Sequence, residues 1–213
     1  ALNRGRHNFD RIRIEYFGDY DAAFEGFKGG AYTFRNEASS LIWATRYDFP
    51  ALKNGWVKKA ELHDGDIASG QAFVINLRRE KFQDLRVREA LGLMFNFEWS
   101  NASLFYGLYA RINSFWENSD MAASGLPSPE ELALLEPMAD LLPPGVLDQE
   151  PVMAPVSGER QLDRRNLRKA AALLDEAGWA VGNDGMRRNA KGETLKVEML
   201  NDSQTFDRVF TPY

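Results

Sequence analysis

The residue types that most often carry chemistry are sparse in this sequence of 213 residues. Cysteine is absent, which excludes disulfide frameworks, thiolate metal sites and cysteine nucleophiles. The two histidines, His7 and His63, lie far apart in the sequence, and we interpret them as surface residues. A zinc site or a histidine-based catalytic triad needs more partners than these two provide. The sequence therefore predicts no metal site and no catalytic residues of this kind.

Charged pairs are the next candidates for chemistry. Adjacent carboxylates occur at Glu130-Glu131 and Asp175-Glu176, but neighbouring residues on a helix point apart, so we interpret both pairs as solvent-facing. Basic pairs at 164–165 and 187–188 alternate with acidic residues and are typical of solvated faces. Neither a phosphate-binding glycine loop nor a Gly-x-Ser-x-Gly nucleophile motif is present. A hydrolase or transferase on an α/β scaffold stays an alternative, without the clustered nucleophile and base that it requires.

The composition indicates a folded, acidic protein. Apolar residues make up 44% and aromatic residues 12% of the chain. A formal net charge of −5 and a pI near 5.2 argue against a protein that binds the phosphate backbone of nucleic acids, so no nucleic-acid partner is expected. The sequence has no apolar run of roughly 18 residues that could cross a bilayer, and no N-terminal signal pattern. Its first and last residues adjoin strand-like segments, so we expect an internal fragment of a longer protein.

Alternation of apolar and polar residues predicts strands at 11–17 and 56–62, and we interpret the short segment 31–35 and the apolar segment 72–77 as two further strands. The strands at 11–17 and 31–35 flank a short helix that Asp19 would cap and the glycines after Lys28 would end, which gives a compact β-α-β unit. Such units are typical of an α/β fold with a parallel or mixed sheet.

Helical spacing predicts the remaining elements. The strand at 72–77 leads through a polar turn into a helix that Asp84 would cap, with one buried face made by Val87, Ala90, Leu91, Met94 and Phe95. A helix starting at Glu98 would bury Trp99, Ala102, Phe105 and Leu108. The clearest helix covers 164–177, and Gly178 and Trp179 predict a Schellman ending. A hairpin at 184–188 and 193–200 would follow, turning through 189–192.

Two further stretches leave alternatives open. The segment 109–161 holds seven of the nine prolines and one short helical piece near 129–135, so we expect a functional loop or extended packing over a scaffold. Trp43, Tyr47 and Phe49 lie close together in the sequence. They indicate a satellite cluster beneath a long loop, with a ligand-facing aromatic wall as the alternative.

Four motifs, in order along the chain, resemble the family 5 extracellular solute-binding proteins, the peptide- and nickel-binding receptors of ABC importers. They are Phe24…Phe27-x-x-Gly30, Asn76-Leu77 followed by Phe82-x-Asp84-Leu85-Arg86-Val87-Arg88-x-Ala90-Leu91, Leu167-x-x-Ala170-x-x-Leu173-Leu174-x-Glu176-Ala177-Gly178-Trp179, and Asp184-Gly185-Met186…Gly192-Glu193-x-Leu195. Within the family, Phe95–Trp99, Phe115–Ser119 and Ser124–Pro127 resemble the YejA-type branch, associated with oligopeptide uptake. The chain departs from the family where Tyr32-Thr33-Phe34 replaces the usual acidic residue, so ligand contacts there are expected to differ.

This resemblance implies a periplasmic-binding-protein type II fold, in which two α/β lobes joined by a hinge enclose the ligand. Residues 1–68 would form the end of the first lobe, and 69–213 the hinge crossover strand and part of the second. The resemblance also implies an exported, periplasmic receptor that hands oligopeptides to ABC permease subunits. It implies no cofactor and no catalysis, and we expect a monomer. Receptors of the same fold for nickel complexes, sugars or cell-wall peptides stay alternatives.

The same resemblance gives candidate ligand contacts at two places. One follows the last strand of the first lobe, where Arg35 would pair with a ligand carboxylate and Glu37 with an ammonium group. The other begins the crossover strand. The alternative for each is a structural ion pair within the loop, or plain strand packing. The predicted ligand-binding residues are Arg35, Asn36, Glu37, Trp43, Gly70, Gln71, Ala72 and Phe73.

Overall fold

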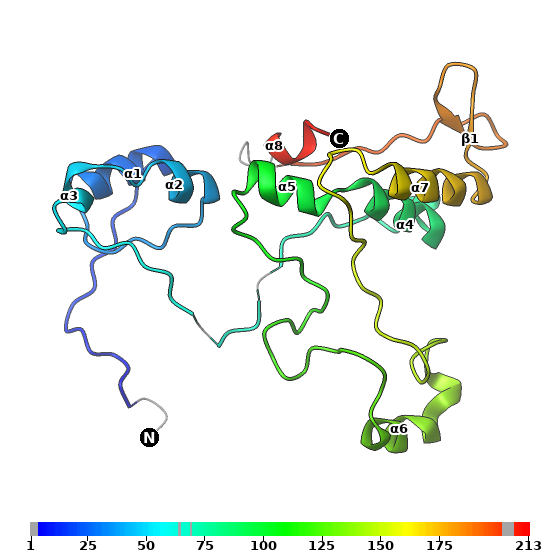
Figure 1. Ribbon diagram of the computed structural model, residues 1–213, viewed down its shortest axis with the longest axis horizontal. Helices are drawn as coiled ribbons and strands as arrows, with labels where there is room; N and C mark the ends of the chain where they lie inside the picture. Colours follow the sequence, from blue (N-terminus) through cyan, green and yellow to red (C-terminus); the bar gives the residue numbers. More distant parts are fainter. Residues whose placement is uncertain (1–3, 64, 69, 202–206) are drawn as a thin grey trace. The chain divides into compact units, whose positions relative to one another are not determined.

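A computed structural model describes residues 4–63, 65–68, 70–201 and 207–213. The chain divides into two compact units, Ala1–Glu61 and Leu62–Tyr213. The regular elements of both units are mainly helices (Figure 1). Among the described residues, regular β-structure is limited to the antiparallel pair of β1 (Ala180–Val181) and β2 (Arg187–Arg188). None of the described helices is long and apolar enough to cross a membrane.

The first unit holds three short helices, α1 (Tyr20–Lys28), α2 (Ser40–Thr45) and α3 (Pro50–Lys53). The start and end of α1 confirm the prediction, since the Asp19 carboxylate accepts a hydrogen bond from the Ala22 N–H at 2.7 Å and Gly29 is the C-cap. The core of the unit consists of Phe24, Ile42 and Phe49. The Phe49 ring lies edge-on to that of Phe24, with the ring centroids 6.2 Å apart. The aromatic residues at 43–49 therefore help to form the core of this unit.

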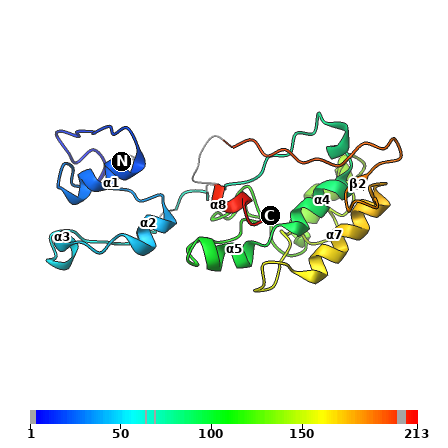
Figure 2. The same cartoon turned by 90° about the horizontal axis from the view of Figure 1, so that it is seen from above.

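The second unit is built on two helices, α4 (Leu85–Met94) and α7 (Arg164–Glu176), which lie side by side in both views (Figures 1 and 2). Asp84 caps α4 as predicted, accepting the Arg86 N–H at 2.9 Å. The remaining helices of the unit are η1 (Glu80–Phe82), α5 (Phe97–Leu104), α6 (Pro129–Leu135), η2 (Glu136–Leu141) and α8 (Asp207–Phe210). The buried core between α4 and α7 consists of Phe82, Val87, Ala90, Leu93, Ala170, Leu174 and Trp179.

The end of α7 confirms the predicted Schellman motif. Gly178 has a φ of 84°, which glycine adopts without steric cost. The Trp179 N–H donates to the Leu174 carbonyl at 2.8 Å, and the Gly178 N–H donates to Asp175 at 3.0 Å. Trp179 thereby folds back onto Leu174, and both side chains are buried in the core.

The helix predicted from Glu98 is shorter than expected, because α5 ends at Leu104. Tyr106 and Gly107 have φ values of 59° and 71°, which a right-handed helix cannot contain. Leu108, expected inside, is 42% exposed, and Ala102 is exposed as well.

The N-cap of α5, Asn96, is 2% exposed and connects distant parts of the second unit. Its side-chain oxygen accepts the Trp99 N–H at 2.8 Å. Its Nδ2 donates to the carbonyls of Gly158, at 2.9 Å, and Arg160, at 2.8 Å. One buried amide therefore joins the start of α5 to the segment that leads into α7.

The prediction of four strands is wrong, because none forms at 11–17, 31–35, 56–62 or 72–77. The β-α-β unit built from the first two is therefore wrong as well. A strand exists only through hydrogen bonds to a neighbouring strand, and none of these segments pairs with another described segment. Apolar side chains that a sheet would have helped to bury are therefore exposed, as Ile12 (76% exposed) and Tyr16 (89% exposed) show.

The predicted hairpin forms only in part. Its turn is present, with the Asn189 N–H donating to the Glu193 carbonyl at 3.1 Å and Thr194 bridging to Arg188. The strand pairing is different, because β2 pairs with β1, on its N-terminal side, through a turn at 182–186. The short helix predicted near 129–135 is confirmed as α6, which begins with a capping box of Ser128 and Glu131.

Candidate ligand-binding site

Arg35 and Glu37, two of the predicted ligand contacts, are brought together in the first unit. The Arg35 Nε donates to Glu37 Oε2 at 2.9 Å, and the two side chains are only 7% and 1% exposed. The Arg35 guanidinium also donates to the Tyr32 hydroxyl at 2.9 Å and lies over the Tyr20 ring, 4.5 Å from its centroid. In an extended segment, residues two apart point to the same side, which explains why these two side chains meet.

The Glu37 carboxylate accepts four hydrogen bonds. Oε1 accepts the Tyr20 hydroxyl at 2.5 Å and the Ser39 N–H at 3.0 Å, while Oε2 accepts from Arg35 and from the Tyr47 hydroxyl at 3.1 Å. Burial alone would raise the pKa of Glu37, but the hydrogen bonds from Arg35 and Tyr20 outweigh it and hold this pKa below its ordinary value. Burial and the nearby Glu37 charge raise the pKa of Tyr47 to about 12. Glu37 is therefore a fully satisfied anion.

Arg35 keeps one unused donor. Its Nη2 is buried and has no hydrogen-bond partner among the described residues. A buried donor without a partner costs roughly 1–3 kcal/mol. Burial would lower the pKa of Arg35, but its hydrogen bonds to Glu37 and Tyr32 raise it above the ordinary value. Of the two partners, Arg35 is thus the one that can still donate to an anion.

The other predicted contacts of the first unit differ in exposure. Asn36 is exposed, whereas Trp43 is half-buried. The Trp43 ring lies edge-on to Tyr47, with centroids 5.5 Å apart. Lys59 places its Nζ 4.0 Å from the centroid of the indole ring and donates to the Trp43 carbonyl at 2.6 Å. One face of Trp43 therefore carries a cation.

In the second unit, residues 70–73 are exposed and non-helical. Residues 70–75 make no backbone hydrogen bond to any part of the chain that the structure describes. The Phe73 ring packs on Phe95 and Phe210, at centroid distances of 5.5 and 5.2 Å. Gly70 lies against Ile112, whose Cδ1 would be 3.2 Å from an added Cβ. Neighbouring side chains thus hold both ends of this segment, while its backbone stays unpaired.

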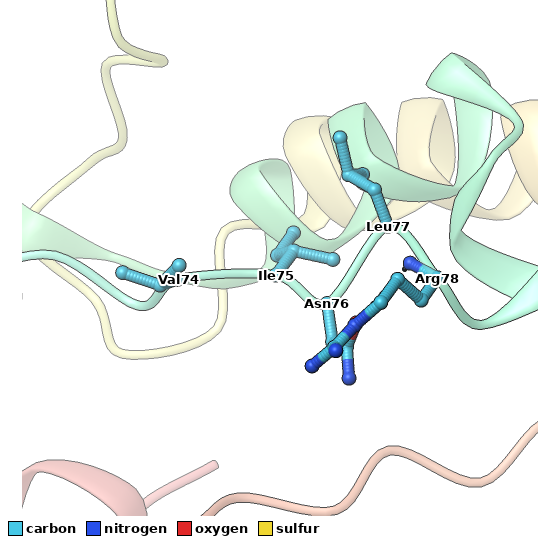
Figure 3. Close-up of a pocket in the computed structure, with 5 residues that line it drawn as sticks. All are labelled: Val74, Ile75, Asn76, Leu77 and Arg78. Atoms are coloured by element: carbon cyan, nitrogen blue, oxygen red, sulfur yellow. Dashed lines mark hydrogen bonds between the residues drawn. The ribbon is translucent and has the colours of Figure 1, made fainter.

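An open depression of about 570 Å³ follows directly, lined by Val74, Ile75, Asn76, Leu77 and Arg78. Figure 3 shows Ile75 and Leu77 pointing toward the helices while Asn76 and Arg78 point the opposite way. Asn76 Oδ1 accepts the Arg78 N–H at 3.1 Å, which fixes the turn into η1. The side chains of this segment therefore alternate as they would in a strand, although the segment pairs with no other described segment.

Comparison with known proteins decides the family. Residues 3–212 match the model of the bacterial extracellular solute-binding proteins, family 5 (middle part). The chain belongs to this family.

Relatives within the family are similar to the chain along its whole length. It is 44% identical over 214 residues to the probable peptide-binding protein YejA of Agrobacterium fabrum, covering 100% of the chain and 35% of that relative. It is 39% identical over 212 residues to the uncharacterized protein YejA of Escherichia coli, covering 100% of the chain and 35% of that protein. The peptidoglycan-binding protein YepA of A. fabrum is 32% identical over 218 residues, covering 98% of the chain and 35% of YepA.

The chain therefore spans about a third of the length of these relatives. The predicted resemblance to a YejA-type family 5 protein is confirmed. Family 5 membership implies the two-lobe type II periplasmic-binding fold and indicates a binding protein rather than an enzyme. The contact of the eight predicted residues with a ligand, and the division into lobes at 68 and 69, stay predictions.

In this family 5 chain, the residues that sequence reasoning missed are mainly aromatic and cationic. Of the two tyrosines that donate to Glu37, Tyr20 gave no motif, whereas Tyr47 was predicted only as part of the aromatic cluster with Trp43 and Phe49. Arg111 lies between two aromatic rings near Phe73 and also gave no signal. Among the described residues, no group of three or more histidines and carboxylates could hold a metal ion.

Proposed function

We propose that the chain is part of the substrate-binding component of an ABC importer, which binds oligopeptides in the periplasm and delivers them to membrane permease subunits. The observation that carries this proposal is the match of residues 3–212 to family 5, together with 44% identity to a relative named as a probable peptide-binding protein. The protein acts as a monomer and closes around its ligand by a hinge motion, which contacts made only in the closed state stabilise.

Residues 1–68 form the end of the first lobe, and residues 69–213 form the hinge crossover and part of the second. The boundary between the two compact units, after Glu61, lies close to this lobe boundary and supports it. Segments 11–17 and 72–77, which have strand patterns but no strand partner among the described residues, then complete sheets with other parts of a longer protein.

The crossover segment is the main peptide contact in this proposal. An extended peptide is best held through its backbone, by donors and acceptors that the receptor leaves unpaired. Residues 70–75 offer such groups, and the open depression at 74–78 continues them. Gly70, Gln71 and Ala72 contact the peptide main chain, and Phe73 borders a side-chain pocket that tolerates different residues.

The first lobe contributes Arg35, Asn36, Glu37 and Trp43. Arg35 Nη2 is the donor available for a ligand carboxylate, whereas Glu37 has to exchange one of its present donors for a ligand ammonium group. The exposed Asn36 and the indole of Trp43 border the same ligand.

A second candidate ligand is a cell-wall peptide. It is favoured by the 32% identity to a relative named as a peptidoglycan-binding protein. Both candidates are peptides, so the same backbone contacts serve either of them.

Native mass spectrometry of the protein at the full length of its relatives tests this proposal. We expect co-purified peptides, and peptides that contain D-amino acids or muramic acid would favour the cell-wall candidate. Absence of any bound peptide, with no uptake of peptides after unfolding and refolding, would contradict the proposal.

Calorimetry then tests the crossover segment. Gln71→Ala should weaken peptide affinity about tenfold at an unchanged melting temperature, because one ligand hydrogen bond is worth about 1.4 kcal/mol. Gln83→Ala, at the exposed C-cap of η1, is the matched control and should bind as the unaltered protein does. Equal affinity in both variants would remove Gln71 from the site.

A further inference from the structure

Hydrogen bonds of Asn101 at the end of α5 set the position of Arg111. The Asn101 side chain accepts the Tyr109 N–H at 3.1 Å and donates to the Tyr109 carbonyl at 2.7 Å. The Gly107 N–H donates to the Asn101 carbonyl at 2.8 Å. These bonds turn the chain back along α5, so that Arg111 lies over rings at the start of that helix. Its position is therefore set by the backbone and does not depend on an ion pair of its own.

The Arg111 guanidinium is held by aromatic rings alone. Its Cζ lies 5.7 Å from the centroid of the Phe95 ring and 5.4 Å from that of Phe97. It makes no ion pair with a described carboxylate. None of its three guanidinium nitrogens has a hydrogen-bond partner among the described residues, and of the three only Nε is fully buried. Cation–π contact uses the face of the guanidinium, so the in-plane N–H groups stay available.

Two other partly buried arginines of this chain, unlike Arg111, donate to carboxylates. Arg35 donates to Glu37, and Arg187 donates to Asp175 at 2.6 Å. Glu98 is the carboxylate whose charge acts on Arg111, but it accepts its hydrogen bond from the Ser157 N–H, at 2.9 Å. Burial lowers the pKa of Arg111 below its ordinary value, and Glu98 offsets this only in part. A second carboxylate beside Arg111 would stabilise its charge.

The surroundings of Arg111 include the predicted ligand segment. Phe95 touches both Arg111 and Phe73, and Ile112, the residue after Arg111, packs on Gly70. Arg111 is therefore connected to both ends of the segment 70–73 through one intervening residue at each end, Phe95 and Ile112, and the backbone of this segment pairs with no described residue.

We infer that Arg111 binds a carboxylate of the peptide ligand, end-on through its two Nη nitrogens, next to the segment 70–73. This inference rests on the proposed function and adds a specificity: the site prefers peptides that carry a carboxylate at this position. The carboxylate is either the C-terminus of the peptide or an acidic side chain, and the chemistry of recognition is the same for both.

Two random tetrapeptide libraries test the inference on the protein at the full length of its relatives. One library has free C-termini and the other has C-terminal amides, and retained peptides are quantified by mass spectrometry. If the carboxylate is the C-terminus, the unaltered protein retains the free-acid library at least tenfold better. If it is a side chain, Asp and Glu are enriched among the retained amides.

Arg111→Gln should abolish whichever preference is seen, and Arg111→Lys should keep part of it. Arg168→Gln on the exposed side of α7 removes the same charge elsewhere and should keep the preference in full. Retention of both libraries by the unaltered protein, without preference for either carboxylate, overturns the inference and leaves the proposed function standing. That readout requires no variant to fold.

Two further outcomes also count against the inference. If Arg111→Gln lowers the melting temperature but keeps the preference, the partner of Arg111 is a carboxylate of the protein itself. If the unaltered protein retains no peptide from either library, the proposed function fails and this inference fails with it.

Discussion

The two cores of this chain are stabilised by different means. In the first unit, Phe24 is surrounded by other rings and by three cations, Lys28, Arg35 and Arg46, whose charged groups lie 4.7 to 5.7 Å from its centroid. In the second unit, α4 and α7 meet through side chains such as Val87, Leu93 and Leu174, with their charged residues outside. The first unit buries an ion pair, Arg35–Glu37, beside its core, whereas the buried polar side chains of the second unit, such as Asn96 and Asn166, are uncharged.

This difference follows from helix length. The helices α1, α2 and α3 have 9, 6 and 4 residues, whereas α4 and α7 have 10 and 13. Short helices present too few apolar side chains to bury each other, so rings and charged hydrogen bonds fill the remaining space. We therefore expect the stability of the first unit to depend mainly on its buried charges, and the stability of the second unit mainly on the volume of its packed side chains.

Removing the central ring of the first unit should have the largest effect. Phe24→Ala is expected to lower the free energy of unfolding by about 4 kcal/mol, because it leaves a cavity among the surrounding rings and cations. Unfolding in urea measures the loss, and hydrogen exchange followed by mass spectrometry locates it. Leu174→Ala, with an expected loss of about 3 kcal/mol in the second unit, is the counterpart. A Phe24→Ala loss below about 1 kcal/mol would contradict the assignment of Phe24 as the centre of that core.

Neutralising the buried anion should have the next largest effect. Glu37→Gln leaves the Arg35 charge buried without its counter-ion, and we expect a loss of about 2–3 kcal/mol in urea unfolding. Glu25→Gln is the matched control, since Glu25 pairs with Lys28 and Arg46 at the surface. Such exposed pairs are worth at most about 1 kcal/mol. Similar losses in the two variants would mean that burial of the Arg35–Glu37 pair contributes little.

The pH dependence of stability sharpens the same point. The folded pKa of Glu37 lies below the ordinary value of 4.5, so Glu37 stabilises the fold above about pH 4.5, and this contribution is lost as the pH falls further. We expect Glu37→Gln to flatten the decline in melting temperature between pH 6 and pH 3, relative to the unaltered protein. Parallel profiles for the two proteins would assign the acid sensitivity to other carboxylates, such as Asp163, whose pKa is also lowered.

The smallest expected effect concerns a helix end in the second unit. The Asp163 carboxylate accepts the backbone N–H groups of Arg165, at 2.8 Å, and Asn166, at 3.0 Å. Asp163→Ala should cost about 1 kcal/mol, the usual cost of losing an N-cap, and increase hydrogen exchange in the first turn of α7. Asp175→Ala near the other end of α7 is the control and should leave that first turn protected. An unchanged stability of Asp163→Ala would show that packing on α4 alone fixes the start of α7.

Helices were predictable because a helix satisfies its own backbone. Asp84 and Asp163 mark the starts of α4 and α7, and Gly178 and Trp179 mark the end of α7. Helical spacing gave part of the buried faces, including Val87, Ala90 and Leu174, but missed Leu93. Strands were not predictable, because the alternating pattern at 11–17 and the apolar run at 72–77 depend on strand partners that the described residues do not supply. A strand prediction depends on hydrogen bonds to a second segment, which a local pattern cannot supply.

The candidate site was predictable only where residues are near in sequence. Arg35 and Glu37 are two positions apart in an extended segment, so their pairing follows from the geometry of the backbone. Their contacts with Tyr20 and Tyr47 arise from folding of α1 and α2 around Phe24 and have no local signal. The position of Arg111 depends in the same way on the left-handed turn at Tyr106 and Gly107, which the helical spacing concealed.

The amide of Asn96 has a consequence for how relatives of this chain can vary. The Asn96 side chain bonds directly to Gly158 and Arg160, so the segment between Asn96 and Gly158 forms a closed loop. The hydrogen bonds that close this loop involve no residue inside it. Doubling the length of such a loop costs only about 0.6 kcal/mol. Evolution can therefore lengthen or shorten this loop to suit new partners, and an engineer can insert a reporter domain there, without disturbing α4 and α7.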